Sequence, residues 1–111
     1  MSMCKGRHLE WYEVKIGILL EGLGFSRRIV SSALGVHKES LEQWREKIMN
    51  RIIQGDTRDL EELQMVINII LKDENSFITK KFKELLKKCL ELEEAKRKML
   101  KEMYRRRCQE I

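Results

Sequence analysis

The chain has no proline, only two histidines and only three cysteines among its 111 residues. Without proline, nothing in the sequence forces a break in a long helix. Cys4, Cys89 and Cys108 are odd in number and lack paired spacing, which argues against a disulfide framework and favours a reducing cytoplasm. The histidines have no accompanying ligands, and no serine or cysteine has a recognisable base partner. We therefore expect no enzyme activity, metal, cofactor or small-molecule substrate.

Long apolar runs are also missing. The longest, Met65 to Leu71, is interrupted by Asn68 and is far shorter than the ~18–20 residues that a membrane span needs. Lys5, Arg7 and Glu10 prevent an apolar run near the start of the sequence, so we expect no signal peptide. The sequence predicts a cytoplasmic protein without a membrane partner.

Charged and hydrophobic residues dominate what is present. They make up 37% and 42% of the chain, a balance that, without proline, predicts an all-α fold with many surface ion pairs. The net charge is +5, which favours an anionic partner. Residues 1–55 carry nine Lys or Arg against six Asp or Glu, and residues 56–111 carry fourteen against twelve. Neither half is therefore a strongly basic arm.

The segment Ser26–Trp44 has the pattern of two short helices joined by a tight Gly35-Val36 turn. Ser26 can accept a hydrogen bond as an N-cap, and Gly35 can end the first helix in the left-handed conformation. Apolar residues recur at helical spacing on both sides of the turn and in an upstream helix that ends near Gly22. They are Trp11, Val14, Ile18 and Leu19, then Ile29, Val30, Ala33 and Leu34, then Leu41, Trp44, Ile48 and Ile52.

Three such helices within residues 1–55 form the smallest self-supporting helix-turn-helix domain. We expect the large aromatic rings of Trp11 and Trp44 to anchor its core. The second helix of the motif buries one face and leaves the other free to lie in a DNA groove. The spacing thus predicts a DNA-binding domain at the start of the chain.

Residues 14–48, VKIGILLEGLGFSRRIVSSALGVHKESLEQWREKI, also resemble a known module. An aliphatic helix ending in glycine, an aliphatic pair, a Leu-Gly-Val turn and a Ser-Leu-x-x-Trp run are similar to the helix-turn-helix of bacterial insertion-sequence transposases and resolvase-like proteins. His37 departs from the Ser or Thr that usually starts the second helix there. The resemblance implies DNA recognition, followed in some insertion-sequence proteins by a coiled-coil helix. Phage small terminase subunits have a similar layout.

The motif assigns roles to particular side chains. Helix starts lie near the DNA backbone and the second helix lies near base edges. We predict base reading by His37, Lys38, Ser40 and Gln43, and phosphate contacts by Arg27, Arg28, Lys38, Arg45 and Lys47.

The predicted outer face of that second helix is not basic. At 100° per residue it carries Glu39, Gln43, Glu46 and Asn50. Carboxylates near phosphates are repulsive unless they are aimed at a base that donates to them, such as cytosine. A three-helix unit used only for protein contacts therefore stays open as an alternative.

Residues 56–111 predict a helical oligomerisation region, with a helix over about 57–72 and a long helix over about 77–107. The apolar run Met65–Leu71 predicts a helix that is buried on most sides. Along the long helix, apolar residues alternate four and three apart with one polar exception at Lys96, which is a heptad seam. The predicted interface between copies contains Ile67, Ile70, Ile78, Phe82, Leu85, Cys89, Leu92, Met99 and Met103. Basic clusters at Lys80–Lys88 and Lys96–Arg107 could also reach phosphate.

These patterns favour a sequence-specific double-stranded DNA-binding protein that acts as a homodimer, either a transcriptional regulator or the DNA-recognition subunit of a mobile element. Two-fold symmetry would present two recognition helices to two half-sites. Two alternatives remain: a DNA-packaging or architectural subunit in a multimeric ring, and a helical interaction module that binds no nucleic acid.

Overall fold

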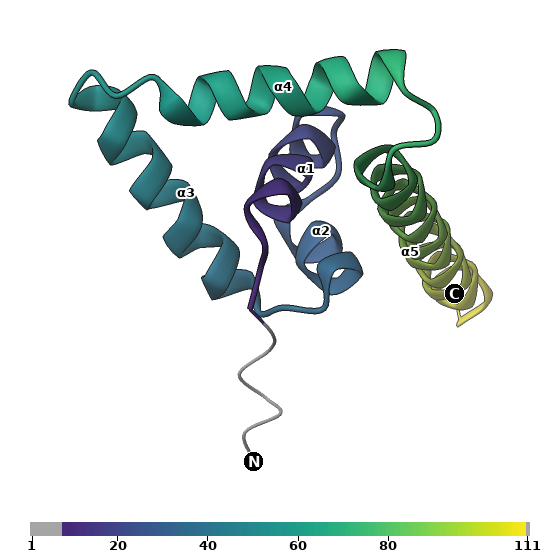
Figure 1. The fold of residues 1–111 in the computed structure, drawn as a ribbon. Coiled ribbons are helices and arrows are strands. Elements are labelled where there is room, and N and C mark those ends of the chain that lie inside the picture. Colours follow the sequence, from purple (N-terminus) through teal and green to yellow (C-terminus); the bar gives the residue numbers. More distant parts are fainter. Residues whose placement is uncertain (1–7, 111) are drawn as a thin grey trace.

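The computed structural model describes residues 8–110, with side chains described as far as Arg107. This part of the chain contains five α-helices and no strand (Figure 1), so the predicted all-α class is confirmed. The helices are α1 (Trp11–Gly22), α2 (Arg27–Leu34), α3 (Lys38–Ile53), α4 (Arg58–Lys72) and α5 (Phe77–Glu110).

The corner between α2 and α3 forms as its sequence predicts. The Ser26 hydroxyl accepts a hydrogen bond from the Ile29 N–H at 3.2 Å, which caps the start of α2. Gly35 ends α2 with φ of 76°, a left-handed conformation that costs glycine little. Helix α3 then begins after His37, whose side chain makes no capping hydrogen bond.

Helices α1, α2 and α3 pack closely because α1 presents a glycine where they meet. A Cβ atom on Gly17 would lie 3.3 Å from Leu34 Cδ1 and 3.6 Å from Val30 Cγ1 on α2, and 3.8 Å from Leu41 Cδ2 on α3. No side chain keeps the helices apart at this point. The result is a shared core with Val30 and Leu34 almost completely buried.

Helix α4 lies across α1, α3 and α5 (Figure 1). It is held by what we call the Asp59 cluster, which consists of Lys15, Arg51, Asp59 and Glu62. Lys15 Nζ lies 3.2 Å from Asp59 Oδ1 and 2.9 Å from Glu62 Oε1, and Arg51 Nε lies 2.9 Å from Asp59 Oδ2. The cluster therefore ties α1, α3 and α4 together.

The apolar run Met65–Leu71 is buried within its own chain on one side only, so burial on most sides stays a prediction that requires a second copy. Only Val66 of this run is fully buried, and Leu71 is 75% exposed. Helix α4 rests on the other helices along one side, so the rest of its apolar circumference faces outward.

The first half of α5 packs against α2 and α4. Ile78, Leu85 and Cys89 are buried in the chain's own core, together with Thr79, whose hydroxyl donates to the Asp73 carbonyl at 2.6 Å. Burial also raises the pKa of the Cys89 thiol. From Glu94 to Arg107 every residue is exposed. Helix α5 thus has a covered half and a projecting half.

This arrangement corrects the predicted interface between copies. The spacing of the seam indicates which residues of α5 share a face, but it does not indicate whether that face meets its own chain. Helix α2 is packed by α1 and α3 and also by α5, so the start of the seam is already covered. Ile78, Leu85 and Cys89 are therefore unavailable to a second copy, whereas Leu92, Met99 and Met103 remain exposed.

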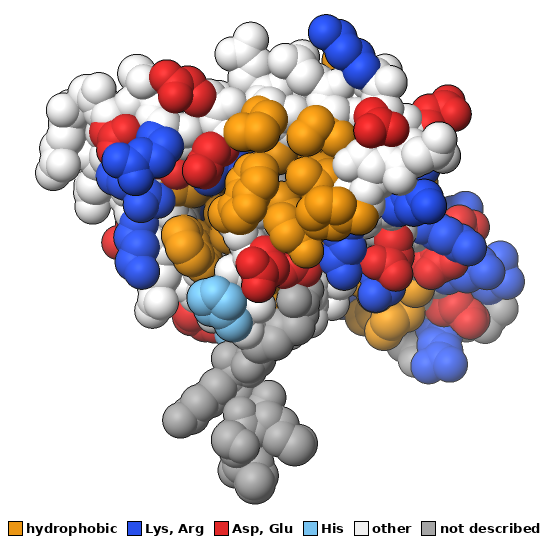
Figure 2. Space-filling model, in the orientation of Figure 1, with side chains coloured by type: hydrophobic (Ala, Val, Ile, Leu, Met, Phe, Trp, Pro, Cys, Tyr) orange, Lys and Arg blue, Asp and Glu red, His pale blue; other side chains and the backbone are white. Residues whose placement is uncertain are grey.

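Aromatic side chains gather where α1 and α5 begin. The Tyr12 ring meets the rings of Trp11 and Phe77 edge to face, with centroids 5.9 Å and 5.1 Å apart. Trp11 is 41% exposed, so it is not the core anchor expected from its spacing, whereas Trp44 packs against the core. Figure 2 shows hydrophobic side chains in a continuous patch below α4 and over the start of α1.

None of the helices in residues 8–110 is long and apolar enough to cross a membrane.

Candidate nucleic-acid interface

Helix α3 has one packed face and one free face. Leu41 and Ile48 are buried, with Trp44 and Ile52 packed beside them. The opposite residues, Glu39, Gln43, Glu46 and Asn50, are all exposed and are called the outer face of α3 below. No other part of the described chain seals this face. The geometry required of a groove-reading helix is therefore present.

The four predicted base-reading residues do not share one surface. His37, Lys38 and Gln43 are exposed, whereas Ser40 is half-buried. Lys38 and Ser40 lie about 160° apart around the helix axis at 100° per residue, so they fall on opposite flanks of α3. Gln43 alone of the four lies at the centre of the outer face. Around the axis, Ser40 lies about 60° from Gln43 and Lys38 about 140°, so a duplex contacted by Gln43 would meet Ser40 more readily than Lys38, with His37 at the start of the helix.

Three of the five predicted phosphate contacts are paired with carboxylates in the Glu21 network, which consists of Glu21, Arg27, Lys38, Glu42 and Arg45. Arg45 Nη1 lies 3.0 Å from Glu21 Oε1, and Arg27 Nη1 lies 3.6 Å from Glu42 Oε1. Lys38 Nζ lies 4.0 Å from the same Glu42 oxygen. The network joins the end of α1, the start of α2 and the first half of α3.

These pairs are weak enough to be exchanged. The three cationic side chains are 36–52% exposed, and a solvent-exposed ion pair contributes only about 0–1 kcal/mol. A DNA backbone offers the same cations an array of phosphates whose neutralisation releases condensed counterions. Arg27 and Arg45 also line a hollow of about 290 Å³ beside Glu46 and Asn50, next to the outer face.

Arg28 and Lys47, the remaining two predicted phosphate contacts, do not belong to the Glu21 network. Arg28 is exposed and forms no ion pair with a residue that the structure describes. Lys47 Nζ lies 5.2 Å from the centroid of the Trp44 ring, a cation–π contact that leaves the ammonium exposed. Both charges are available to a polyanion without breaking an ion pair.

Sequence reasoning missed Glu21 and Asp59 as organising residues. Glu21 lies in the last turn of α1, where its spacing gave no sign that it would face α2 and α3. Asp59 lies in the first turn of α4, where an acidic residue is usual because of the helix dipole. Its salt bridges to Lys15 and Arg51 come from tertiary packing.

No cluster of three or more His, Cys, Asp or Glu side chains that could hold a metal occurs in the described part of the chain. Comparisons with protein families, curated proteins and solved structures found no match to this chain. The resemblance of residues 14–48 to transposase and resolvase-like modules therefore stays a prediction.

Proposed function

We propose that this protein binds double-stranded DNA sequence-specifically, with the outer face of α3 against base edges and the start of α2 against the backbone. The observation that carries the proposal is the free outer face of α3, held by a packed inner face in a three-helix corner. Arg28 and Lys47 would provide the first phosphate contacts, and the Glu21 network would provide more by exchanging partners.

The carboxylates on the outer face of α3 would favour some bases over others. Glu39 and Glu46 flank Gln43, and neither forms an ion pair with a described residue. A carboxylate accepts a hydrogen bond from the cytosine amino group, and glutamine pairs with adenine. We therefore expect a target that contains C and A on the strand facing α3. Guanine-rich targets, which arginine usually reads, are disfavoured.

A dimer fits the exposed end of α5. Leu92, Met99 and Met103 continue the seam beyond the part that the chain covers itself. Two linked modules would gain affinity through effective concentration, which offsets the weak attraction of one mildly acidic reading helix. A transcriptional regulator and the DNA-recognition subunit of a mobile element both fit this description.

One observation favours a second candidate, a protein-interaction module without nucleic acid. Arg27, Lys38 and Arg45 are already neutralised by Glu21 and Glu42, as they would be on a surface that meets another protein. Binding to duplex DNA that falls steeply with salt separates the two candidates, because a protein that neutralises phosphates releases their counterions.

The direct test is selection of bound fragments from a pool of random duplex DNA by the full chain. The proposal expects enrichment of a defined motif, arranged as two half-sites if the protein acts as a dimer. Recovery of unenriched sequence, or of no DNA above a protein-free control, would contradict it.

A further inference from the structure

The end of α5 projects from the body of the protein and carries an exposed apolar stripe. Residues 92–107 are here called the projecting segment, and all except Glu93 are exposed. Met99 is 67% exposed and Met103 is 53% exposed, although both lie on the same seam that is buried at Leu85 and Cys89. Leu100 and Tyr104 widen the stripe. Because this stripe begins inside a core and continues into solvent, we expect its exposed part to pack against another helix.

The charges of α5 are separated along its length. Residues 88–95 hold one lysine against three glutamates, a net charge of −2. Residues 100–107 hold one lysine and three arginines against one glutamate, a net charge of +3. The acidic block adjoins the body and the basic block lies at the far end.

This separation distinguishes the two ways in which two copies could pair. Side by side in the same direction, the basic block of one copy would lie against the basic block of the other. In opposite directions, each basic block would lie against an acidic block. The run of Lys96, Arg97 and Lys98, between the two blocks, would meet its counterpart in either orientation, so its net charge does not distinguish the two pairings. Like charges along a coiled coil disfavour a pairing, and opposite charges set the orientation.

The position of Lys96 is a second, independent reason to expect antiparallel pairing. It is the one charged residue within the seam of the projecting segment. In a parallel pair, equivalent seam positions face each other, so two Lys96 ammonium groups would meet at the centre of the interface. In an antiparallel pair, the two kinds of seam position alternate across the interface, and Lys96 faces an apolar residue. Its long side chain can then reach solvent past that residue.

Only one antiparallel register uses every exposed seam position. Leu92 lies opposite Met103 and Lys96 lies opposite Met99, with the two-fold axis passing between residues 97 and 98. A shift of one heptad in one direction requires Cys89, which is buried in its own chain. A shift in the other direction leaves only Met99 and Met103 as apolar partners.

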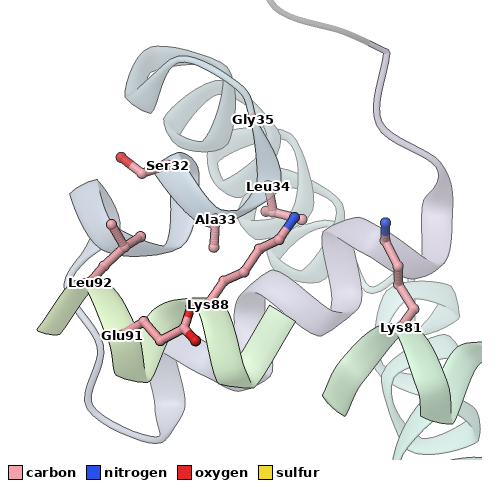
Figure 3. A pocket seen from close by; sticks show the side chains of 8 residues that line it. All are labelled: Ser32, Ala33, Leu34, Gly35, Lys81, Lys88, Glu91 and Leu92. Atoms are coloured by element: carbon pink, nitrogen blue, oxygen red, sulfur yellow. The ribbon is translucent and has the colours of Figure 1, made fainter. Parts of the chain in front are cut away.

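A groove lies where the partner's helix would end. It has a volume of about 530 Å³ and is formed between the end of α2 and α5, with Ser32, Gly35, Glu91 and Leu92 among its lining residues. Figure 3 shows Leu92 at one end of it and Lys88 extending from α5 across it toward Leu34. The backbone carbonyls at the end of α2 carry partial negative charge. An arriving basic helix terminus would meet that end and Glu91, with Lys81 and Lys88 also in the lining.

We propose that two copies of this chain pair antiparallel through residues 92–107 of α5, each basic end docking beside the α2–α5 groove of the other copy. The overlap of residues 88–107 spans about 30 Å at 1.5 Å per residue. The two helix-turn-helix units then lie at opposite ends of a shared rod. The pairing rests on the dimer of the proposed function and specifies its orientation, but it does not itself require DNA.

Disulfide trapping in the full chain tests the orientation. Leu92→Cys and Met103→Cys are made separately in a Cys4→Ser/Cys108→Ser background, one of them with a tag that changes its mass. In the proposed register, an oxidised mixture of the two gives a covalent dimer of mixed mass, and neither variant alone forms one. Equivalent cysteines at position 92 would lie about 16 Å apart along the rod, too far for a disulfide. Lys98→Cys, which lies outside the seam, controls for random collision.

Three results would overturn the proposal. The first is covalent dimer from Leu92→Cys alone, which indicates parallel pairing. The second is a monomer of the unsubstituted chain in sedimentation. The third is a dimer in sedimentation without the mixed disulfide, which indicates another interface. Because no DNA is present, each of these leaves DNA binding by a single module to be judged by the selection experiment.

Discussion

Gln43 and Arg28 are both exposed, yet we expect Gln43 to contact a base edge and Arg28 to contact a phosphate. Gln43→Ala should lower discrimination at one base pair by about 1–3 kcal/mol while leaving affinity for unrelated duplexes nearly unchanged. Arg28→Ala should weaken binding to all duplexes alike and reduce the salt slope by roughly one. Titrations of a selected and a scrambled duplex measure both effects. Lys72→Ala, which removes an exposed charge at the far end of α4, is the control. Uniform losses from both substitutions would refute the assignment.

Asp59 is the single residue on which the joint between α1, α3 and α4 depends most. Its side chain is 7% exposed and lies against both Lys15 and Arg51. Removing Asp59 leaves the buried Lys15 with Glu62 as its remaining partner and leaves Arg51, which is 40% exposed, to solvent. Losing such partly compensated hydrogen bonds costs roughly 1–3 kcal/mol. We expect Asp59→Ala to lower the free energy of unfolding by about that amount in denaturant titrations. Glu61→Ala, an exposed carboxylate on the same helix, should change it by less than about 0.5 kcal/mol. Equal effects would show that the cluster is not a structural joint.

At the scale of the helices, the corner between α2 and α3 could be predicted because its signals are local. Ser26 and Gly35 act on their own neighbouring backbone groups, and both behave as the sequence indicates. The packing of α5 could not be predicted, because the seam spacing is the same whether the partner is α2 or another copy. The close approach at Gly17 also gave no signal, since a glycine within a helix has several explanations. Local chemistry thus sets the helix boundaries, and tertiary contacts decide which faces are covered.

The left-handed turn at Gly35 gives a test of that corner. Gly35→Ala should destabilise the fold by about 1–2 kcal/mol, because a Cβ atom is disfavoured at φ of 76°. Gly22→Ala is the matched control: it lies in helix α1, it lacks a positive φ, and nothing lies within 4 Å of the added Cβ. That change should be neutral or stabilising by up to about 1 kcal/mol. Thermal unfolding of both variants measures the difference. A Gly35→Ala variant as stable as the unsubstituted chain would indicate that the turn tolerates another geometry.

At the scale of the whole molecule, the two halves of the sequence share one core. Val66 of α4 and Leu85 and Cys89 of α5 belong to the same buried cluster as Val30 and Leu34. The sequence predicts where the candidate interface lies, but it does not predict which of its cationic side chains are paired with carboxylates. Spacing located the outer face of α3, whereas the pairing of Arg27 and Arg45 with Glu21 depends on a contact that only the folded chain makes. The net positive charge likewise does not indicate where the basic surface lies. In the folded chain, the basic block of α5 projects away from the body.

DNA reading by α3 is tested most directly by the affinity of the full chain for a selected duplex and for a scrambled duplex of equal length, over a series of salt concentrations. If α3 reads bases, the selected duplex binds on the order of 10³-fold more tightly or better near physiological salt. Both affinities should fall linearly with salt on logarithmic axes. Equal affinity for the two duplexes, or binding that does not respond to salt, would contradict the claim that α3 reads DNA.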